Sequence, residues 1–475
     1  MKGLEDIQRL ISQPVTDGTA GTIYFIGVGG IGMSALARYF KSRGFAVAGY
    51  DKTPTVLTAR LEQEGIVIHF EEQVSAIPAD VRLVVYTPAV PKQHKELVYL
   101  QEKQYPVLKR SEVLGLISNS SFNICIAGTH GKTTTTSMVA HILRQSGYGC
   151  NAFLGGIAAN YNTNFWSHER NVSVIEADEY DRSFLRLSPD IAIISSMDAD
   201  HLDIYGTEAA LQDAFIQFSE KVKPGGLLIS KYGLAKTSSL KASRHITYSA
   251  VDTKAVVHAH NIRLQEGGYC FDVQLEDAVM ENVVLNMGGR HNIENITAAI
   301  AVAHALQIDA ASIKAAVAAY AGVKRRFEYI VPPAAGHVVF VDDYAHHPEE
   351  LRALLTGAKG LFAERKCTIV FQPHLFSRTN DFATGFAAVL DQADEIILLP
   401  IYPARELPMP GVSSQLVTDL MQNKNVRIVE KENLVNYLAQ HWLPAVTDPK
   451  KQLLITAGAG DIDTLVQPIK KLLNQ

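Results

Sequence analysis

The chain alternates short apolar runs with segments of helical periodicity, and this pattern predicts parallel sheets covered by helices. In the first third we expect strands at residues 22–27, 45–51 and 81–87, separated by helices at 31–42 and 55–64. A short amphipathic helix is expected in the first eleven residues. Together these elements predict a small nucleotide-binding sheet.

A second sheet is expected to begin with a strand at 122–127, followed by a glycine loop and a helix to about residue 145. Further apolar runs continue this sheet at 171–176, 191–195 and 226–230. From 244 to 286 the pattern changes to short alternating strands with Gly-Gly and Glu-Asp breaks, which predict hairpins at the edge of the domain. Two helices should follow, at 291–306 and 309–319.

A third cycle of strands and helices starts after Lys324-Arg325-Arg326. It predicts a helix from Pro348 and strands at 337–343, 367–371, 394–399 and 451–456. The chain has 475 residues, which is too long for one ordinary core. We therefore expect three α/β domains: a Rossmann-like domain at 1–119, a central P-loop domain at 120–323 and a second Rossmann-like domain at 324–475.

The composition of the chain argues against several functional classes. The 44 basic and 49 acidic residues give a net charge of −5, so there is no electrostatic case for binding nucleic acid. The sequence has no signal-peptide core and no apolar run long enough to span a membrane, which needs about 18 residues. Its four cysteines are scattered, without metal-binding spacing. These features predict a cytoplasmic protein that does not bind a membrane.

The first glycine loop has the pattern GxGxxG at residues 27–32, between a predicted strand and a predicted helix. Glycines there let the backbone approach a diphosphate at the start of the helix. Asp51, at the end of the next strand, can accept hydrogen bonds from a ribose hydroxyl or a base N–H. Taken alone, this loop would indicate an NAD-dependent dehydrogenase, or a tight turn without a ligand.

The second glycine loop favours a different chemistry. Residues 128–134 have the sequence GTHGKTT, after a strand and before a helix. In such a loop the backbone N–H groups hold phosphates, Lys132 reaches the terminal phosphate oxygens and Thr133 ligates Mg²⁺. Only two residues separate Gly128 from Gly131, where the usual P-loop has four, but the lysine and the helix start are retained. We expect ATP to bind here.

Acidic clusters follow two further strands. One cluster is EADEYD at 176–181 and the other is DADHLD at 198–203, which contains His201. Adjacent carboxylates repel one another unless a cation compensates them, so a metal ion beside a phosphate is the natural partner. The alternative is a solvated acidic loop.

Polar residues also stand before one helix and at four strand ends farther along the chain. Asn292 and Asn295, one helical turn apart, could hydrogen-bond an adenine, although spacing alone favours helix capping. In the third domain, polar groups gather at DDYAHHP (342–348), PHLFSRT (373–379), PIYPARE (400–406) and AGAGDI (457–462). They predict one site rim, with no indication of its substrate.

These motifs together resemble the Mur ligases, and the resemblance runs over nearly the whole chain. It also includes GVGGIGMS at 27–34 and GRHNIEN at 289–295. The resemblance implies a UDP-binding N-terminal domain, a central ATPase and a C-terminal domain that closes over both. It is strongest to the enzymes that join L-alanine to UDP-N-acetylmuramate in peptidoglycan precursor synthesis, using ATP and Mg²⁺ through an acyl phosphate. Such an enzyme would be a monomer or a homodimer.

The resemblance also implies roles for individual residues. Lys132 would hold the transferred phosphoryl group, with Thr133, Glu176 and His201 positioning Mg²⁺. The remaining nucleotide contacts would come from Gly128, Thr129, His130, Gly131, Thr134, Asn292, Asn295, Arg326 and Asp342. The sugar nucleotide would contact Gly27, Gly29, Gly30, Ile31, Gly32, Ser34, Asp51 and Thr87. The amino acid and the reacting carboxylate would be held by Tyr344, His346, His374 and Arg378.

Three alternatives remain open, one among the ligases and two from another functional class. Tyr180 stands where the L-alanine ligases most often have serine, and a tyrosine is found there in the murein peptide ligase, which adds a tripeptide to the same sugar nucleotide. From another functional class, the two loops could belong to an oxidoreductase or to a non-catalytic nucleotide sensor.

Overall fold

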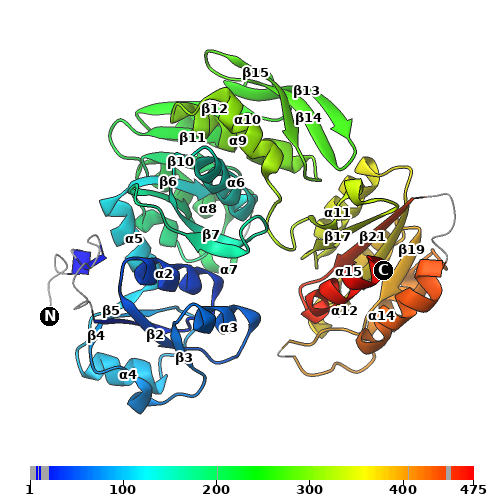
Figure 1. Cartoon of the computed structure of the whole chain (residues 1–475), viewed down its shortest axis with the longest axis horizontal. Helices are drawn as coiled ribbons and strands as arrows, with labels where there is room; N and C mark the ends of the chain where they lie inside the picture. The colour runs from blue at the N-terminus through cyan, green and yellow to red at the C-terminus, as the bar shows by residue number, and fades with distance from the viewer. Residues whose placement is uncertain are drawn as a thin grey trace. The chain divides into compact units, whose positions relative to one another are not determined.

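The structure is a computed structural model that describes residues 7–8, 10–11, 21–199, 202–404, 406–444 and 451–474. It contains three sheets in the order expected along the chain (Figure 1). By contacts, the chain divides into two compact units. Unit 1 is Met1–His260, Val273–Glu281 and Glu294–Val317, and unit 2 is Asn261–Asp272, Asn282–Ile293 and Ala318–Gln475.

The first sheet has the order β3-β2-β1-β4-β5 and is parallel throughout. Alternate residues of β1 face opposite ways: Ile23 and Phe25 pack with helices α2 and α5, whereas Tyr24 and Ile26 pack with α4. Because both faces are covered, every residue of β1 is buried. The bounds are β1 Thr22–Ile26, α2 Ile31–Ser42, β2 Ala46–Tyr50, α3 Val56–Gln63, β3 Val67–His69, β4 Val81–Tyr86, α4 Lys95–Glu102, β5 Val107–Lys109 and α5 Arg110–Ser120.

The second sheet has ten strands in the order β15-β14-β13-β12-β11-β10-β6-β9-β7-β8. The helix after the second glycine loop, α6, is buried along most of its length, including four consecutive threonines. The bounds are β6 Phe122–Ala127, α6 Lys132–Gln145, β7 Asn151–Ala158, β8 Thr163–Trp166, β9 Val172–Glu176, β10 Ile191–Ile194, α7 Leu202–Tyr205, α8 Glu208–Ser219, β11 Leu227–Lys231, β12 Arg244–Ser249, β13 Val257–Gln265, β14 Gly268–Gln274, β15 Val279–Leu285, α9 His291–Ala305 and α10 Ala310–Ala319.

The expected hairpins between 244 and 286 need one correction. β12 pairs in parallel with β11 and therefore extends the central parallel sheet, and β13 pairs in parallel with β12. Only β13, β14 and β15 follow one another as neighbours joined by tight turns. Alternation along the sequence could not reveal this, because the partner of a strand is set by the whole sheet and not by its own residues.

The third sheet has the order β16-β17-β21-β18-β19-β20, with β16 antiparallel to the rest. One face of it packs against α11 and α12, and the other carries a second apolar cluster with α14 and α15. The bounds are β16 Glu328–Val331, β17 Val338–Asp343, α11 Pro348–Leu361, β18 Lys366–Phe371, α12 Phe376–Leu390, β19 Glu395–Leu398, α13 Ser414–Leu420, β20 Val426–Ile428, α14 Leu434–Tyr437, β21 Gln452–Ala457 and α15 Val466–Leu473.

Most of the motifs singled out in the sequence follow parallel strands directly. The first glycine loop follows β1, the second follows β6, and the acidic motif begins at the last residue of β9. In the third sheet, motifs follow β17, β18, β19 and β21. Ligands of open α/β sheets bind at this edge. Within the described residues, none of the helices has the length and apolar character that crossing a membrane requires.

The core of the central sheet gives a direct test of this fold. Ile193 lies in β10, between β6 and β11, and is fully buried, whereas Val56 at the start of α3 is 75% exposed. We expect Ile193→Ala to lower the free energy of unfolding by about 2–5 kcal/mol, because it leaves a cavity, and Val56→Ala to change it by less than about 0.5 kcal/mol. Denaturant titrations of both variants check this, and equal losses would contradict the assigned core.

Candidate active site

The second glycine loop positions a lysine at the start of α6. Gly131 caps the helix with a left-handed backbone, φ 80°, which an L side chain adopts only with strain. Lys132 is the first helical residue, and its Nζ donates hydrogen bonds to the carbonyl oxygen of Gly128 and to Oε1 of Glu179, both at 2.7 Å. The lysine is therefore held over the loop in a fixed position.

Glu179 is a functional candidate that the sequence reading did not single out. Its side chain is fully buried, and burial raises the pKa of Glu179 while the neighbouring Lys132 ammonium opposes that shift. Its backbone carbonyl accepts a 2.6 Å hydrogen bond from the Tyr205 hydroxyl. The EADEYD motif contains four acids, and only the fold shows that this one turns toward the lysine.

A hydroxyl and a carboxylate lie together beside this helix start. Oγ1 of Thr133 donates to Oε1 of Glu176 at 3.0 Å, and the other carboxylate oxygen accepts from the backbone N–H of Gly155, also at 3.0 Å. Oxygen ligands of this kind suit Mg²⁺, which commonly takes one or two carboxylates and completes its shell with water and phosphate. The residues fit the expected ion. No group of three His, Cys, Asp or Glu residues among the described residues forms a fuller metal site.

Two serines at the end of β10 hold the loop from the other side. Oγ of Ser196 accepts hydrogen bonds from the Thr129 hydroxyl at 2.9 Å and from the backbone N–H of His130 at 2.7 Å. Ser195 donates to the carbonyl oxygen of His130. The His130 ring is exposed and Thr134 is buried within α6. The sequence predicts Ser195 and Ser196 only as the end of a strand, so it does not indicate their contacts with the second glycine loop. The expected metal ligand His201 lies outside the described residues.

The two asparagines of α9 have different surroundings. Asn295 lies against the second loop, since a Cβ added to Gly131 would sit 2.7 Å from its Oδ1. Asn292 is buried, and its Nδ2 donates to the carbonyl oxygen of Gly288 at 2.7 Å, within the turn that starts the helix. Asn292 thus has the local contact expected of a capping residue, and Asn295 has the position expected of a nucleotide contact.

The first glycine loop is hydrogen-bonded to Asp51, which follows β2. The backbone N–H of Gly29 donates to Oδ2 of Asp51 at 2.7 Å, and that of Thr53 donates to Oδ1 at 3.2 Å. Ser34 is fully buried, donating to the carbonyl oxygen of Ile31 at 2.9 Å and accepting from Asn164 at 3.0 Å. In this structure Ser34 therefore stabilises the first turn of α2, away from any open surface.

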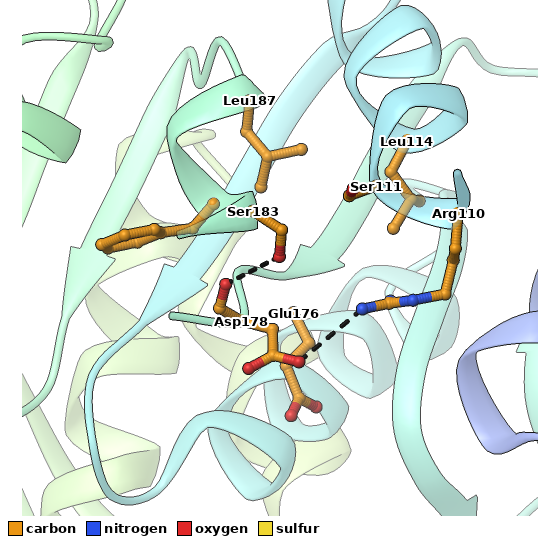
Figure 2. A pocket seen from close by; sticks show the side chains of 8 residues that line it. Arg110, Ser111, Leu114, Glu176, Asp178, Ser183 and Leu187 are labelled. Carbon is orange, nitrogen blue, oxygen red and sulfur yellow. Dashed lines mark hydrogen bonds and ion pairs between the residues drawn. The ribbon is translucent and has the colours of Figure 1, made fainter. Parts of the chain in front are cut away.

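A cavity of about 360 Å³ in unit 1 brings the first loop and the acidic motif together. The cavity is lined by Gly30, Ile31 and Gly32 at the start of α2 and by Thr87 after β4. On the other side it is lined by Gly155 of β7 and by Glu176 and Asp178 of the acidic motif. Arg110 also lines this cavity. Its Nη2 lies 3.6 Å from Oδ2 of Asp178, an ion pair that Figure 2 shows from a smaller pocket lined by Arg110, Glu176, Asp178 and Ser183. Arg110 was missed in the sequence, because the three-residue strand β5 that precedes it was too short to be predicted.

In unit 2, the buried Asp342 and the partly buried Asp343 end β17. Oδ1 of Asp342 accepts from the Thr456 hydroxyl at 2.6 Å and its Oδ2 lies 3.5 Å from Nε of Arg325. Asp343 accepts from the backbone N–H groups of Phe327 and Ala345, both at 2.7 Å. Burial raises the pKa of Asp342 to about 7, opposed by Arg325, and raises the pKa of Asp343 to about 6. Asp342 is therefore enclosed by protein in this structure.

Arg325 is a further residue that the sequence reading missed, since only its neighbour Arg326 was assigned. Arg325 has a left-handed backbone, φ 59°, and its guanidinium lies over the Tyr344 ring at 5.0 Å. Arg326 is exposed. The sequence Lys-Arg-Arg does not distinguish these two arginines. Their backbone conformations differ, and their side chains therefore have different neighbours.

The other expected residues of unit 2 form one cluster. Nδ1 of His346 lies 2.9 Å from the carbonyl oxygen of Tyr344, and its ring centre is 5.9 Å from that of His374. Arg378 Nη1 lies 3.3 Å from Nδ1 of His374, which also stacks on Tyr402. Partial burial lowers the pKa of His374, and the neighbouring Arg378 lowers it further. The neutral imidazole can then accept the hydrogen bond from the guanidinium.

Comparison with known proteins identifies family models and relatives that match this chain. Three family models match in succession: the Mur ligase family catalytic domain at 22–121, the Mur ligase middle domain at 126–303 and the Mur ligase glutamate ligase domain at 325–460. The UDP-N-acetylmuramate–L-alanine ligase of Flavobacterium johnsoniae is 48% identical over 95% of this chain and 98% of its own length. The protein of that name from Cytophaga hutchinsonii is 46% identical over 96% and 97%.

The chain belongs to the Mur ligase family. A solved UDP-N-acetylmuramate–alanine ligase from Thermotoga maritima is 28% identical to this Mur ligase, with a TM-score of 0.79 over 96% of this chain and 99% of that one. A murein peptide ligase from Psychrobacter arcticus, 22% identical, shares the fold with a TM-score of 0.63. The expected three-domain α/β fold is confirmed.

The contact between Gly131 and Asn295 can be isolated with a matched pair of variants. Gly131→Ala and Gly147→Ala both place an alanine at a left-handed position, φ 80° and 74°, but only the first Cβ meets another side chain. We expect both variants to lose about 1 kcal/mol of stability. Only Gly131→Ala should raise the KM for ATP, by roughly tenfold, a change worth about 1.4 kcal/mol. Equal KM values would contradict the place of Gly131 in the nucleotide site.

The buried Asp342 predicts a specific pH dependence of stability. Its folded pKa, about 7, is above the ordinary value of 3.8, so the folded state binds the proton more tightly. The associated stability is fully present below about pH 4 and is lost as the pH rises through 7. We expect the melting temperature of the wild type to fall relative to that of Asp342→Asn between pH 4.5 and 7.5. Parallel melting profiles would show that this carboxyl does not titrate as described.

Proposed function

We propose that this Mur ligase joins L-alanine to UDP-N-acetylmuramate at the expense of ATP, in the synthesis of peptidoglycan precursors. The two relatives described above carry this activity in their names and match nearly the whole chain. The observation that supports the reaction type is the cavity of unit 1, which joins a diphosphate-type glycine loop to the acidic motif beside Thr133. Since both ATP and the sugar nucleotide are cytoplasmic metabolites, we propose that the enzyme works in the cytoplasm.

The first step requires that a carboxylate oxygen of the sugar acid attack the γ-phosphorus of ATP, with ADP leaving. Both reactants are anions, so positive charge must neutralise the phosphate oxygens before they can approach. We propose that Lys132 supplies this charge, with its Nζ held beside the second glycine loop by Glu179. Thr133, Glu176 and His201 would hold Mg²⁺, which neutralises phosphate charge when bound. Glycine N–H groups at the starts of α2 and α6 would hold the diphosphate and the triphosphate.

The second step joins the amine. The neutral amine of L-alanine attacks the acyl carbon and the C–N bond forms. Phosphate leaves with the oxygen that came from the carboxylate and takes up the proton that the amine loses. We propose that Arg378, next to a neutral His374, binds the carboxylate of the amino acid, with His346 and Tyr344 beside it. Asn295 would contact the adenine.

Amino-acid-dependent phosphate release tests the proposed function. Purified protein is given ATP, Mg²⁺ and UDP-N-acetylmuramate, and phosphate is measured with each amino acid in turn. We expect release that depends on L-alanine and yields a product heavier by one alanyl residue in mass spectrometry. Release only with the murein tripeptide would establish the alternative ligase activity that Tyr180 left open, and no release with either acceptor would reject both.

Lys132 gives the sharpest mutational test of the phosphate site. We expect Lys132→Ala to reduce kcat by at least about a hundredfold, because a fixed positive charge at the transferred phosphoryl group is lost. Lys236→Ala is the matched control, since Lys236 pairs with Asp213 on the surface of the same unit. It should leave kcat unchanged. Circular dichroism spectra show whether each variant keeps its fold, and substantial ligation by a folded Lys132→Ala would contradict the assigned role.

A further inference from the structure

Arg110 has a position that none of the motifs explains. It is the first residue of α5 and follows β5, so it lies at the same edge of the first sheet as the glycine loop. A Cβ added to Gly32 would sit 3.0 Å from its Nη1. Among the described residues that line the 360 Å³ cavity, it is the only basic one. An anionic ligand in the cavity therefore finds its side-chain counter-charge at Arg110.

In this structure the carboxylate facing Arg110 is that of Asp178. Oδ2 of Asp178 lies 3.6 Å from Nη2 of Arg110, and Oδ1 accepts from the backbone N–H of Tyr180 at 3.1 Å. The loop is fixed by its main chain, because the carbonyl oxygen of Asp178 accepts from the Ser183 hydroxyl at 3.0 Å (Figure 2) and from the N–H of Phe184 at 3.1 Å. The side chain of Asp178 can therefore turn away from Arg110 without unfolding the loop.

The geometry of this ion pair indicates that it can be exchanged. Its side chains are 25% and 41% exposed, and ion pairs of that kind contribute only about 0–1 kcal/mol. A ligand carboxylate oxygen can replace this pair with a charge-assisted hydrogen bond from the guanidinium. The pair formed by Lys132 and Glu179 is different, since it is shorter, at 2.7 Å, and its carboxylate is fully buried.

We propose that the carboxylate of Asp178 occupies the position beside Arg110 that the carboxylate of the sugar acid takes in the complex. The sugar acid displaces Asp178 from Arg110 when it binds. This inference rests on the proposed function. Once the glycine loop holds the nucleotide part of the substrate, its carboxylate is presented to Arg110 at high effective concentration. Arg110 then binds one carboxylate oxygen and leaves the other free to attack the phosphate. Arg110 is thus the residue that selects a UDP-sugar acid over a UDP-sugar without an acid.

The binding of two ligands, one with and one without a carboxylate, tests whether Arg110 recognises the carboxylate of the substrate. Isothermal titration with Mg²⁺ and a non-hydrolysable ATP analogue compares UDP-N-acetylmuramate with UDP-N-acetylglucosamine, which lacks the carboxylate. We expect Arg110→Gln to weaken binding of the acid by roughly tenfold or more, the value of a charge-assisted hydrogen bond. It should change binding of the non-acid by less than about twofold. Asp178→Asn should tighten binding of the acid only, and should have no effect in the Arg110→Gln background.

The chain provides a matched control at the same contact. Arg186 and Glu112 form a second ion pair between α5 and the segment that follows the acidic motif, at 3.5 Å, and neither residue lines the cavity. Arg186→Gln should leave the affinity for both ligands unchanged. If Arg110→Gln weakens both ligands equally, the guanidinium binds the diphosphate and the proposal is overturned. Weaker binding of the acid by Asp178→Asn would overturn it as well.

The same preparation distinguishes this inference from the proposed function. Wild-type phosphate release with L-alanine is measured alongside the titrations. If release depends on L-alanine but the variants do not separate the two ligands, only the role of Arg110 and Asp178 is rejected. If the wild type releases no phosphate with L-alanine, the proposed function itself is rejected, whatever the variants bind.

Discussion

Two anions have to meet before this enzyme can form a bond, and their mutual repulsion is the constraint on which the arrangement of unit 1 depends. The fold meets it by starting two helices, α2 and α6, from glycine loops at the carboxyl ends of parallel strands. Side chains add the rest of the positive charge. A single cavity is lined by the first loop and by Glu176, and Glu176 is hydrogen-bonded to Thr133 at the start of the second helix.

The two cations to which the proposed reaction gives a role in unit 1, Lys132 and Arg110, are each paired with a carboxylate of the chain. Lys132 is held by the buried Glu179, and Arg110 by the more exposed Asp178. Both acids belong to one short motif after β9, so a single loop positions the charges for both substrates. The difference in burial between Glu179 and Asp178 indicates that the two ion pairs have different functions. In the proposed reaction the first pair fixes the lysine that binds phosphate, whereas the second is exchanged for a ligand carboxylate.

Much of this could be predicted from the sequence, because glycine loops and acids that follow apolar strands report local geometry. The positions of Lys132, Thr133 and Glu176 follow from that pattern. Arg110 and Glu179 could not be found in this way, since their importance comes from contacts across 47 or more residues of sequence, such as that between Lys132 and Glu179. The same limit explains the wrong pairing expected for β12, and the enclosure of Ser34 and Asp342, whose burial depends on neighbours far along the chain.

The most direct test of the account follows the oxygen atoms. UDP-N-acetylmuramate labelled with ¹⁸O in both oxygens of its carboxylate is converted with ATP and L-alanine, and the released phosphate is examined by ³¹P NMR. If the carboxylate attacks the γ-phosphorus within this cavity, each phosphate carries one labelled oxygen. Unlabelled phosphate released together with the ligated product would mean that the two anions never form a bond, and would contradict the arrangement described for unit 1.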